Sequence, residues 1–411
     1  MINRFAIAAL LLAVAAVPVL STQDWTQWRG PEGAAVASTF KPPASWPDEP
    51  RLAWRVPSAG IGHASPVVSG TRVFLFSRIG EQESLTAYDL ASGKQIWRQA
   101  YDAPYEMNPA ARAHGKGPKG TPLVHAGRVF TFGINGILSA FNAADGKSSW
   151  RKDFKEQHAV TAPDFGAAVS PIAIGDAIVV HVGGPKDGAV TAFDAATGAA
   201  RWSWKGDGPG YATPIVATFG GTRQLITQSQ SNVVGIDAAK GALLWQIPFT
   251  TPYDQNIITA VVSDGLMIYS GLSKPTTAVR VTLAAGKWTT EEVWKNPDVP
   301  MYMSSPVLRA GRLCGLTHRN RGQFFCLDAA SGKTLWTSDP RQGEIAGIFA
   351  AGDVLVAATT DGSLIVFRNS AAQFDVVKRY KVAESPVWAH PVPAGRGIVI
   401  KDADSLAYWT F

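Results

Sequence analysis

The side chains with the most chemical potential fall in a few long polar segments that interrupt a repetitive sequence. These segments span residues 101–120, 153–166, 249–256 and 296–303, and a polar loop follows residue 316. Irregular loops on a rigid scaffold are where binding sites are usually found. We therefore predict one binding funnel for a protein or small ligand, formed by Arg112, His114, Asp254, Asn256, Tyr302, His318, Arg319 and His390. The alternative is that these are ordinary polar loop residues at scattered heights.

Specific catalytic motifs do not occur in the sequence. The seven histidines are dispersed with no close pair, so no zinc site is expected. Gly-Lys-Ser at 146–148 and Gly-Lys-Thr at 332–334 resemble the end of a phosphate-binding loop, but the required earlier glycine is Phe141 or Leu327. Neither a Gly-x-Ser-x-Gly elbow nor a His-Glu-x-x-His pair is present. We predict no catalytic residue, no metal site and no cofactor.

A repeated unit must hold these segments in place. It consists of a small residue followed by an acidic or amide residue two positions later, Gly six positions later and Trp ten positions later. Asp and Gly are typical of a tight turn, and the flanking alternating runs predict a hairpin. The positions that we assign to this structural motif are Trp54, Asp89, Gly93, Trp97, Gly146, Trp150, Asp194, Gly198, Trp202, Asp237, Gly241, Trp245, Asp328, Gly332 and Trp336.

A second hairpin precedes each motif, which gives four antiparallel strands per unit. Its first strand opens at eight positions, most of them followed by Pro: Ser65, Thr121, Ser170, Thr213, Thr259, Ser305, Ala346 and His390. Four strands at a period of roughly 40–50 residues are typical of a β-propeller blade. The last unit lacks an outer strand, whereas residues 51–56 form an isolated one ending near Trp54. We therefore predict an all-β, eight-bladed propeller whose ring is closed by this N-terminal strand.

The Ala-x-Asp-x-x-Thr-Gly-x-x-x-Trp pattern resembles the PQQ-like repeat propellers across essentially the whole chain after residue 21. That family includes quinoprotein alcohol dehydrogenases and the propeller lipoprotein of the outer-membrane barrel assembly machinery. The opening residues 24–31, Asp-Trp-Thr-Gln-Trp-Arg-Gly-Pro, also resemble the start of secreted bacterial members of unassigned activity. The resemblance implies that each motif Trp docks on a neighbouring blade near the small residue and Gly. It specifies the fold far better than the function.

Two functions are compatible with this resemblance. The first is a non-catalytic binding or scaffold protein that uses its loop-rich face. The alternative is a dehydrogenase that oxidises alcohols or sugars with PQQ and Ca²⁺. Such relatives use an adjacent Cys-Cys disulfide, an Asp base and oxygen ligands to Ca²⁺. In this sequence, the clustered candidates for the Ca²⁺ ligands are Asp254, Asn256, Glu106 and Asn108. No motif identifies the ligands or the base, so we favour the scaffold.

The N-terminus predicts export from a bacterial cytoplasm. Arg4, an apolar run over 5–20 and small residues at 21–22 are typical of a signal peptide, with an uncleaved anchor as the alternative. No Cys lies near the cleavage region for lipid attachment, and no later run is long enough to cross a bilayer. We divide the chain into a signal peptide (1–21), an extension (22–50) and one propeller (51–411), which we expect to be monomeric and periplasmic or secreted.

Charge and cysteine content narrow the possible partners. The net charge of +6 is spread without a basic run, which argues against nucleic-acid binding. The two cysteines, Cys314 and Cys326, lie on two strands of one predicted hairpin. They are positioned either to form a disulfide in an oxidising compartment or to serve as buried small residues.

Overall fold

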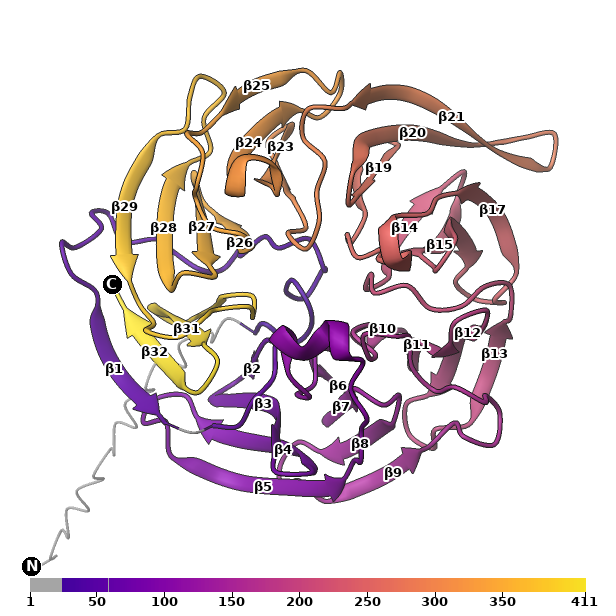
Figure 1. Ribbon diagram of the computed structural model, residues 1–411, viewed down its shortest axis with the longest axis horizontal. Coiled ribbons are helices and arrows are strands. Elements are labelled where there is room, and N and C mark those ends of the chain that lie inside the picture. The colour runs from indigo at the N-terminus through magenta and orange to yellow at the C-terminus, as the bar shows by residue number, and fades with distance from the viewer. Residues whose placement is uncertain (1–23, 58) are drawn as a thin grey trace, which may run out of the picture.

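Eight four-stranded antiparallel sheets surround a central axis, each radiating outward as a propeller blade (Figure 1). This arrangement is a computed structural model that describes residues 24–57 and 59–411. The predicted signal peptide at 1–21 lies outside the described residues. The predicted all-β, eight-bladed architecture is confirmed. Within the described ranges, no helix is both long and apolar enough to cross a membrane.

The first four blades follow one another in sequence, each running from its innermost to its outermost strand. Their strands are β2 (Val67–Ser69), β3 (Arg72–Ile79), β4 (Gln82–Asp89) and β5 (Gln95–Asp102); β6 (Leu123–His125), β7 (Arg128–Phe132), β8 (Leu138–Asn142) and β9 (Ser148–Lys152); β10 (Ile172–Ile174), β11 (Ala177–Gly184), β12 (Asp187–Asp194) and β13 (Ala200–Trp204); and β14 (Ile215–Phe219), β15 (Thr222–Gln228), β16 (Asn232–Asp237) and β17 (Leu243–Pro248).

The remaining blades repeat this order, except that the outer strand of the last blade comes from the N-terminal region. Their strands are β18 (Val261–Ser263), β19 (Leu266–Gly271), β20 (Lys274–Ala284) and β21 (Lys287–Asn296); β22 (Val307–Arg309), β23 (Arg312–Thr317), β24 (Gln323–Asp328) and β25 (Thr334–Thr337); β26 (Ala346–Ala351), β27 (Val354–Thr359), β28 (Ser363–Arg368) and β29 (Val376–Lys381); and β30 (Val392–Ala394), β31 (Gly397–Lys401), β32 (Leu406–Thr410) and β1 (Arg51–Val56). Blades five and seven, whose motifs have drifted, keep four strands each.

The ring closes where the two ends of the chain meet. Strand β1 pairs antiparallel with β32, and Trp54 lies opposite Tyr408. The indole of Trp54 then donates to the carbonyl of Leu90 in blade one at 2.8 Å. Blade eight is thereby completed by the N-terminal strand and held against blade one, as the sequence predicted. Strand β1 thus covers the outer edge of β32, which would otherwise be exposed to pairing with another chain.

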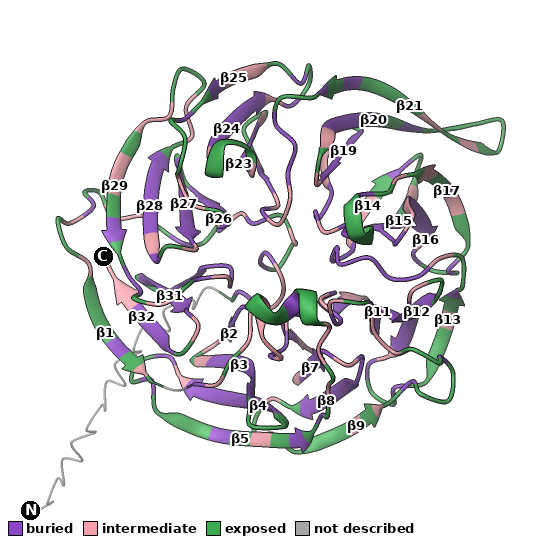
Figure 2. Cartoon of the chain, in the orientation of Figure 1, coloured by how far each residue is buried: buried purple, intermediate pink, exposed green. Residues whose placement is uncertain are grey.

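Middle strands of the blades are buried on both faces, whereas outer strands are mostly exposed (Figure 2). Strand β11, for example, is buried throughout, and β9 is partly or fully exposed. Each sheet packs on its two neighbours, so the inner strands read as continuous apolar runs. The rigid ring then presents its loops on two opposite faces.

The small residue of the motif lies directly across from its tryptophan. Ala192 pairs with Trp202 in the register of β12 and β13, and a bulge follows at the next residue. The same bulge recurs in other blades, as at Ala87 opposite Trp97. A larger side chain at the small position would collide with the indole across the hairpin, which explains the residue type.

Most motif tryptophans pack on the turn glycine of the next blade, as the resemblance implied. An added Cβ at Gly198 would lie 2.9 Å from Cδ2 of Trp150, and one at Gly146 would lie 2.6 Å from Cε3 of Trp97. These glycines also have positive φ. The pairs that share this contact are Trp54–Gly93, Trp97–Gly146, Trp150–Gly198, Trp202–Gly241 and Trp294–Gly332.

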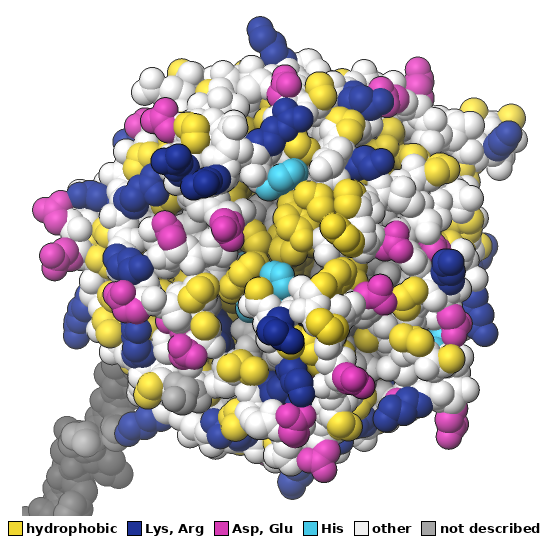
Figure 3. All heavy atoms as spheres, in the orientation of Figure 1, with side chains coloured by type: hydrophobic (Ala, Val, Ile, Leu, Met, Phe, Trp, Pro, Cys, Tyr) yellow, Lys and Arg dark blue, Asp and Glu magenta, His cyan; other side chains and the backbone are white. Residues whose placement is uncertain are grey.

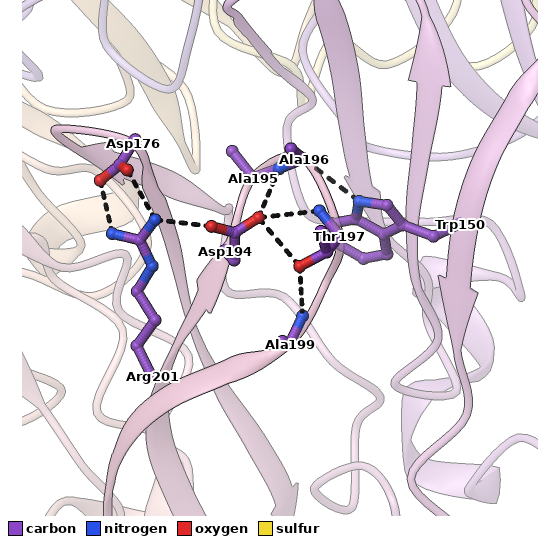
Figure 4. Close-up of polar contacts among 8 residues, drawn as sticks. All are labelled: Trp150, Asp176, Asp194, Ala195, Ala196, Thr197, Ala199 and Arg201. Carbon is purple, nitrogen blue, oxygen red and sulfur yellow. Dashed lines mark hydrogen bonds and ion pairs between the residues drawn. The ribbon is translucent and has the colours of Figure 1, made fainter.

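The Asp of the motif organises the turn that receives the indole (Figure 4). Its carboxylate in blade three, Asp194, accepts from the backbone N–H of Ala196 and Thr197 and from the Thr197 hydroxyl at 2.8–3.0 Å. The Arg201 guanidinium, together with these bonds, holds the pKa of Asp194 far below its usual value. Trp150 of blade two donates to the carbonyl of Ala195 in the same turn. The motif is therefore a blade-to-blade joint.

Blade five departs from this joint. Its outer hairpin, β20 and β21, is longer than those of the other blades and extends beyond the ring (Figure 1). An added Cβ at Gly220 in blade four would lie 3.1 Å from Cη2 of Trp288 in this hairpin. Trp245 donates to Gln224 of its own blade instead of to blade five. The long hairpin thus replaces the usual indole-on-glycine contact.

At five of the eight positions that open the inner strands, a hydroxyl group joins one blade to the next. A Ser or Thr hydroxyl on one blade accepts from the backbone N–H at the equivalent position of the preceding blade, which satisfies a donor facing the axis. The donor–acceptor pairs are Ser65–Thr121, Thr121–Ser170, Ser170–Thr213, Thr259–Ser305 and His390–Ser65, at 2.7–3.2 Å. This network explains why most of these positions are Ser or Thr.

The N-terminal extension crosses the axis and closes one end of it. Trp25 exchanges two backbone hydrogen bonds with Val68 of blade one. The Trp28 indole donates to the Thr259 hydroxyl of blade five at 3.1 Å. Arg29 is buried and donates to the backbone carbonyls of blade six. The extension therefore connects distant blades and turns an open axis into a closed-ended cavity.

Cys314 of β23 and Cys326 of β24 lie directly opposite each other in the register of the hairpin and are joined by a disulfide. Both are buried in the core cluster that extends over blades six, seven and eight. Cys326 also occupies the small position of the motif, opposite Trp336.

Candidate functional site: a closed-ended aromatic cavity

A cavity of about 490 Å³ opens at the centre of the face that carries the long loops. Figure 3 shows hydrophobic and histidine side chains gathered around a hollow in the middle of this face. Trp28 of the N-terminal extension lies at the closed end of the cavity. The lining there also includes four of the Ser and Thr residues that open the inner strands: Ser170, Thr213, Thr259 and Ser305. Cavities of this size suit a small ligand or one or two residues of a polypeptide.

One wall is a cluster of three aromatic rings. Trp388 lies 5.1 Å from the His63 ring and 4.8 Å from the His114 ring, measured between centroids. Nε2 of His63 donates to the carbonyl of His114 at 2.7 Å, since a carbonyl only accepts. Burial lowers the pKa of His63 to about 4 and also lowers that of His114. Both rings are therefore neutral at pH 7 and contribute to an apolar wall.

The opposite wall centres on Tyr302. Its hydroxyl donates to Oε1 of Gln255 at 2.5 Å, and its ring meets the His318 ring edge-on at 6.1 Å. His318 is half-buried behind Tyr302, and its pKa is lowered by burial and by the charge of Arg319. Tyr302 and Gln255 line the cavity, whereas His318 supports Tyr302 from outside it.

Tyr253 stands at the mouth of the cavity with 77% of its surface exposed. It lies in the short 3-10 turn η2 (Pro252–Asp254) with φ of 61°, a left-handed conformation that is costly for a bulky side chain. Exposure and strain at one aromatic residue are typical of a binding contact and give no benefit to folding.

Lys119 is the only Lys or Arg among the described residues that line the cavity, which include no Asp or Glu. Its Nζ donates to the carbonyl of Phe165. Burial lowers its pKa to about 8, so the amine is still mostly charged at pH 7. The cavity thus combines aromatic walls with one cation.

The structure brings only His114 and Tyr302 of the eight predicted funnel residues onto the cavity wall. Asn256 is fully buried, and its amide donates to the carbonyls of Ser229, Gln230 and Phe249. His390 is buried beside Trp25 and Trp28, and its ring nitrogens face the backbone carbonyls of Ile348 and Pro391. The prediction that these two line the funnel is wrong, because their polar atoms are used to hold the backbone.

Three more of the predicted residues are exposed around the mouth instead of inside it. Arg112 lies on the 3-10 helix η1 (Pro109–His114), and Arg319 lies on the 3-10 turn η3 (Arg319–Arg321). Asp254 accepts from the Gln230 amide at 2.9 Å. These side chains shape the outer surface of the face.

Sequence reasoning missed Trp28, His63, Lys119, Tyr253 and Trp388. The two tryptophans had a usable signal, since neither occupies the motif position that accounts for half of the other tryptophans. Lys119 and His63 had no comparable signal, because both lie in connecting segments that do not repeat.

The residues do not fit PQQ held by Ca²⁺. Asn256 and Asn108 use their amide oxygens internally, accepting from Thr251 and from the Ala110 N–H. Across the described ranges, no three His, Cys, Asp or Glu side chains converge in a metal-binding group. The disulfide lies in the core between blades and does not line the cavity. We therefore derive no chemistry through this cofactor.

Comparison with known proteins agrees with the repeat pattern. The family model described as outer membrane protein assembly factor BamB matches residues 81–338 and 289–374. The chain belongs to this family. The BamB of Yersinia pestis is 25% identical over 369 residues, covering 85% of this chain and 86% of that protein. The quinohemoprotein alcohol dehydrogenase ADH-IIG of Pseudomonas putida is 26% identical over 222 residues, which is 47% of this chain and 29% of that enzyme.

Solved structures show the same fold at low identity. The quinohemoprotein alcohol dehydrogenase of Comamonas testosteroni superposes with a TM-score of 0.65 at 15% identity, covering 94% of this chain and 80% of that one. BamB of Moraxella catarrhalis superposes with a TM-score of 0.61 at 13% identity, covering 88% and 100%. Membership of the BamB family and the PQQ-like propeller fold are thus established, as the resemblance predicted.

Proposed function

We propose that this BamB-family propeller is a non-catalytic binding protein of the bacterial envelope, which holds a polypeptide partner on its loop-rich face. The partner inserts an apolar group into the central cavity and contacts the rim around Tyr253. The propeller itself is a rigid support. Export through the predicted signal peptide and action as a monomer in the periplasm are parts of this proposal.

The observation that carries the proposal is the apolar, aromatic hollow at the centre of the loop face. Monomeric proteins rarely leave such surface uncovered unless something binds there. Aromatic anchors that fill a pocket at the centre of a patch usually dominate the energy of protein interfaces. Here the pocket already exists, and Tyr253 projects beside it.

The descriptions of relatives support a polypeptide as the partner. The matched family and its member in Yersinia pestis are described as outer membrane protein assembly factors. Assembly of other proteins requires that a factor contact polypeptides without modifying them. We therefore propose that the partner belongs to outer membrane protein assembly, as either a substrate or a component of the machinery.

Site-specific photo-cross-linking tests this function. A photoreactive phenylalanine analogue is introduced at position 253, and at position 96 as a control. Ile96 is also an exposed hydrophobic residue, at 44%, but it lies on β5 next to a turn of the opposite face. We expect defined adducts with envelope proteins in intact cells from position 253 and none from position 96. Equal adducts at both positions, or none at 253, would contradict the proposal.

A further inference from the structure

We propose that the central cavity recognises an apolar group that carries a single carboxylate, with the carboxylate at Lys119 and the apolar part between the aromatic walls. This inference rests on the proposed binding face and names the chemistry that fits its pocket. The carboxylate has two possible sources, the C-terminus of a partner polypeptide or a small free acid. The experiment below separates them.

The charge of the cavity specifies the sign of the ligand. Lys119 is the one Lys or Arg on the wall, and in the described part of the chain it forms no ion pair with a carboxylate. An ammonium has three donors, and Phe165 accepts from one of them. Charge in an apolar site is costly unless a partner neutralises it. A bound anion would supply that partner.

Lys119 is the one charged group among the described titratable side chains that line the cavity. His63 and His114 face the same cavity and have lowered pKa values, so they are uncharged at neutral pH. Burial keeps Tyr211 and Tyr302 protonated, since the pKa of each is raised. Lys119 therefore acts alone, and one positive charge balances one negative charge.

The walls specify the rest of the ligand. Trp28, Phe165, Tyr302 and Trp388 surround a cavity of about 490 Å³ in which apolar surface predominates. A phosphate or sulfate group would need several donors and would leave these rings unused. An aryl or alkyl carboxylate uses both features, because its body displaces water from the rings while its head meets the amine.

Calorimetry with matched acids and amides tests the inference on the full chain without its signal peptide. The probes are 3-phenylpropanoate and 3-phenylpropanamide, and an acetylated Ala-Ala-Phe peptide with a free or an amidated C-terminus. We expect each acid to bind at least about tenfold more tightly than its amide, because a charge-assisted hydrogen bond is lost in the amide. Equal binding of acid and amide, or no binding of any probe, would overturn the inference.

Variants of two neighbouring lysines localise the effect. Lys119→Met should abolish the preference for acids, and Lys119→Arg should keep much of it. Lys116→Met is the control, because Lys116 lies three residues earlier, outside the cavity lining, and faces Glu81 at 3.7 Å. It should leave the preference unchanged. A preference that survives Lys119→Met, or that is lost in Lys116→Met, contradicts the assignment.

The probes also separate the two sources and the two proposals. A peptide acid that binds more tightly than 3-phenylpropanoate identifies a polypeptide C-terminus, and the reverse order identifies a small free acid. Cross-linking at position 253 reports on the partner independently of these probes. Adducts without acid preference would refute the carboxylate assignment alone, whereas acid preference without adducts would refute the protein partner alone.

Discussion

Replacing Gly198 by alanine should destabilise the propeller well beyond the cost of its backbone conformation. Gly198 has φ of +72°, which costs an alanine about 1–2 kcal/mol. The new Cβ would also lie 2.9 Å from Cδ2 and 3.0 Å from Cε3 of Trp150. Overpacking of this kind costs about 1–3 kcal/mol more. We therefore expect Gly198→Ala to lower the free energy of unfolding by about 2–5 kcal/mol.

Gly175→Ala is a matched control in the same blade. Gly175 has φ of +62°, but an added Cβ there would meet no atom within 4 Å. Gly175→Ala should lower the free energy of unfolding by only the conformational cost of about 1–2 kcal/mol. This loss is about 1–3 kcal/mol smaller than the loss expected for Gly198→Ala. Urea unfolding followed by circular dichroism measures the stability of both variants. If intermediates are populated, the unfolding midpoints of the two variants are compared instead of their free energies.

A double-mutant cycle separates the clash from other effects of the substitution. Trp150→Ala alone should cost about 3–5 kcal/mol, because a large aromatic contact is lost. In that background, Gly198→Ala should cost no more than Gly175→Ala, since the ring that it meets is gone. Equal costs for the two glycines in the native background, or an unchanged Gly198→Ala cost without Trp150, would refute the idea that the motif is a blade-to-blade joint.

Three further changes test other parts of the fold by urea unfolding. Arg29→Met should lower the free energy of unfolding by about 2–4 kcal/mol, because buried carbonyls lose a charged donor. An unchanged midpoint would mean that Arg29 does not hold the extension to blade six. Reducing the Cys314–Cys326 disulfide should lower the free energy of unfolding by about 2–3 kcal/mol, because the disulfide closes only a short loop. The stability of a Cys314→Ala/Cys326→Ala variant should not respond to reductant. An equal response of both proteins would contradict this prediction. Lys119→Met should stabilise the protein at pH 7 by about 1–3 kcal/mol, allowing for partial exposure. The pKa of Lys119 is about 8 in the folded protein and 10.5 when unfolded, so the penalty is complete below pH 8 and fades as pH rises through these two values. The stability difference between Lys119→Met and the native protein should therefore disappear by about pH 11. A difference independent of pH would be evidence against a buried charge.

The fold was predictable because the same physical problem is solved in each blade. The motif's small residue, Asp, Gly and Trp form one joint, so Ala192, Asp194, Gly198 and Trp202 can be recognised as parts of one unit. The closing strand was predictable for the same reason, since Trp54 completes a unit that the C-terminus leaves unfinished.

The cavity was much less predictable, because its residues come from segments that occur once. Asn256 and His390 look like binding residues in sequence, but their polar atoms are used by nearby carbonyls. Lys119 looks like an ordinary surface lysine, and only the fold places it in an apolar hollow. Trp28 forms the closed end because the extension crosses the whole ring, which no local pattern indicates.

The most direct test of the binding face narrows the mouth of the cavity and measures affinity for the partner captured at position 253. Ala110 lies on the exposed side of η1 and lines the cavity, whereas Ala113 is exposed on the same helix outside the lining. We expect Ala110→Trp to weaken binding by about tenfold or more and Ala113→Trp to leave it unchanged. Equal affinity of both variants and the native protein would contradict a partner that inserts into the cavity.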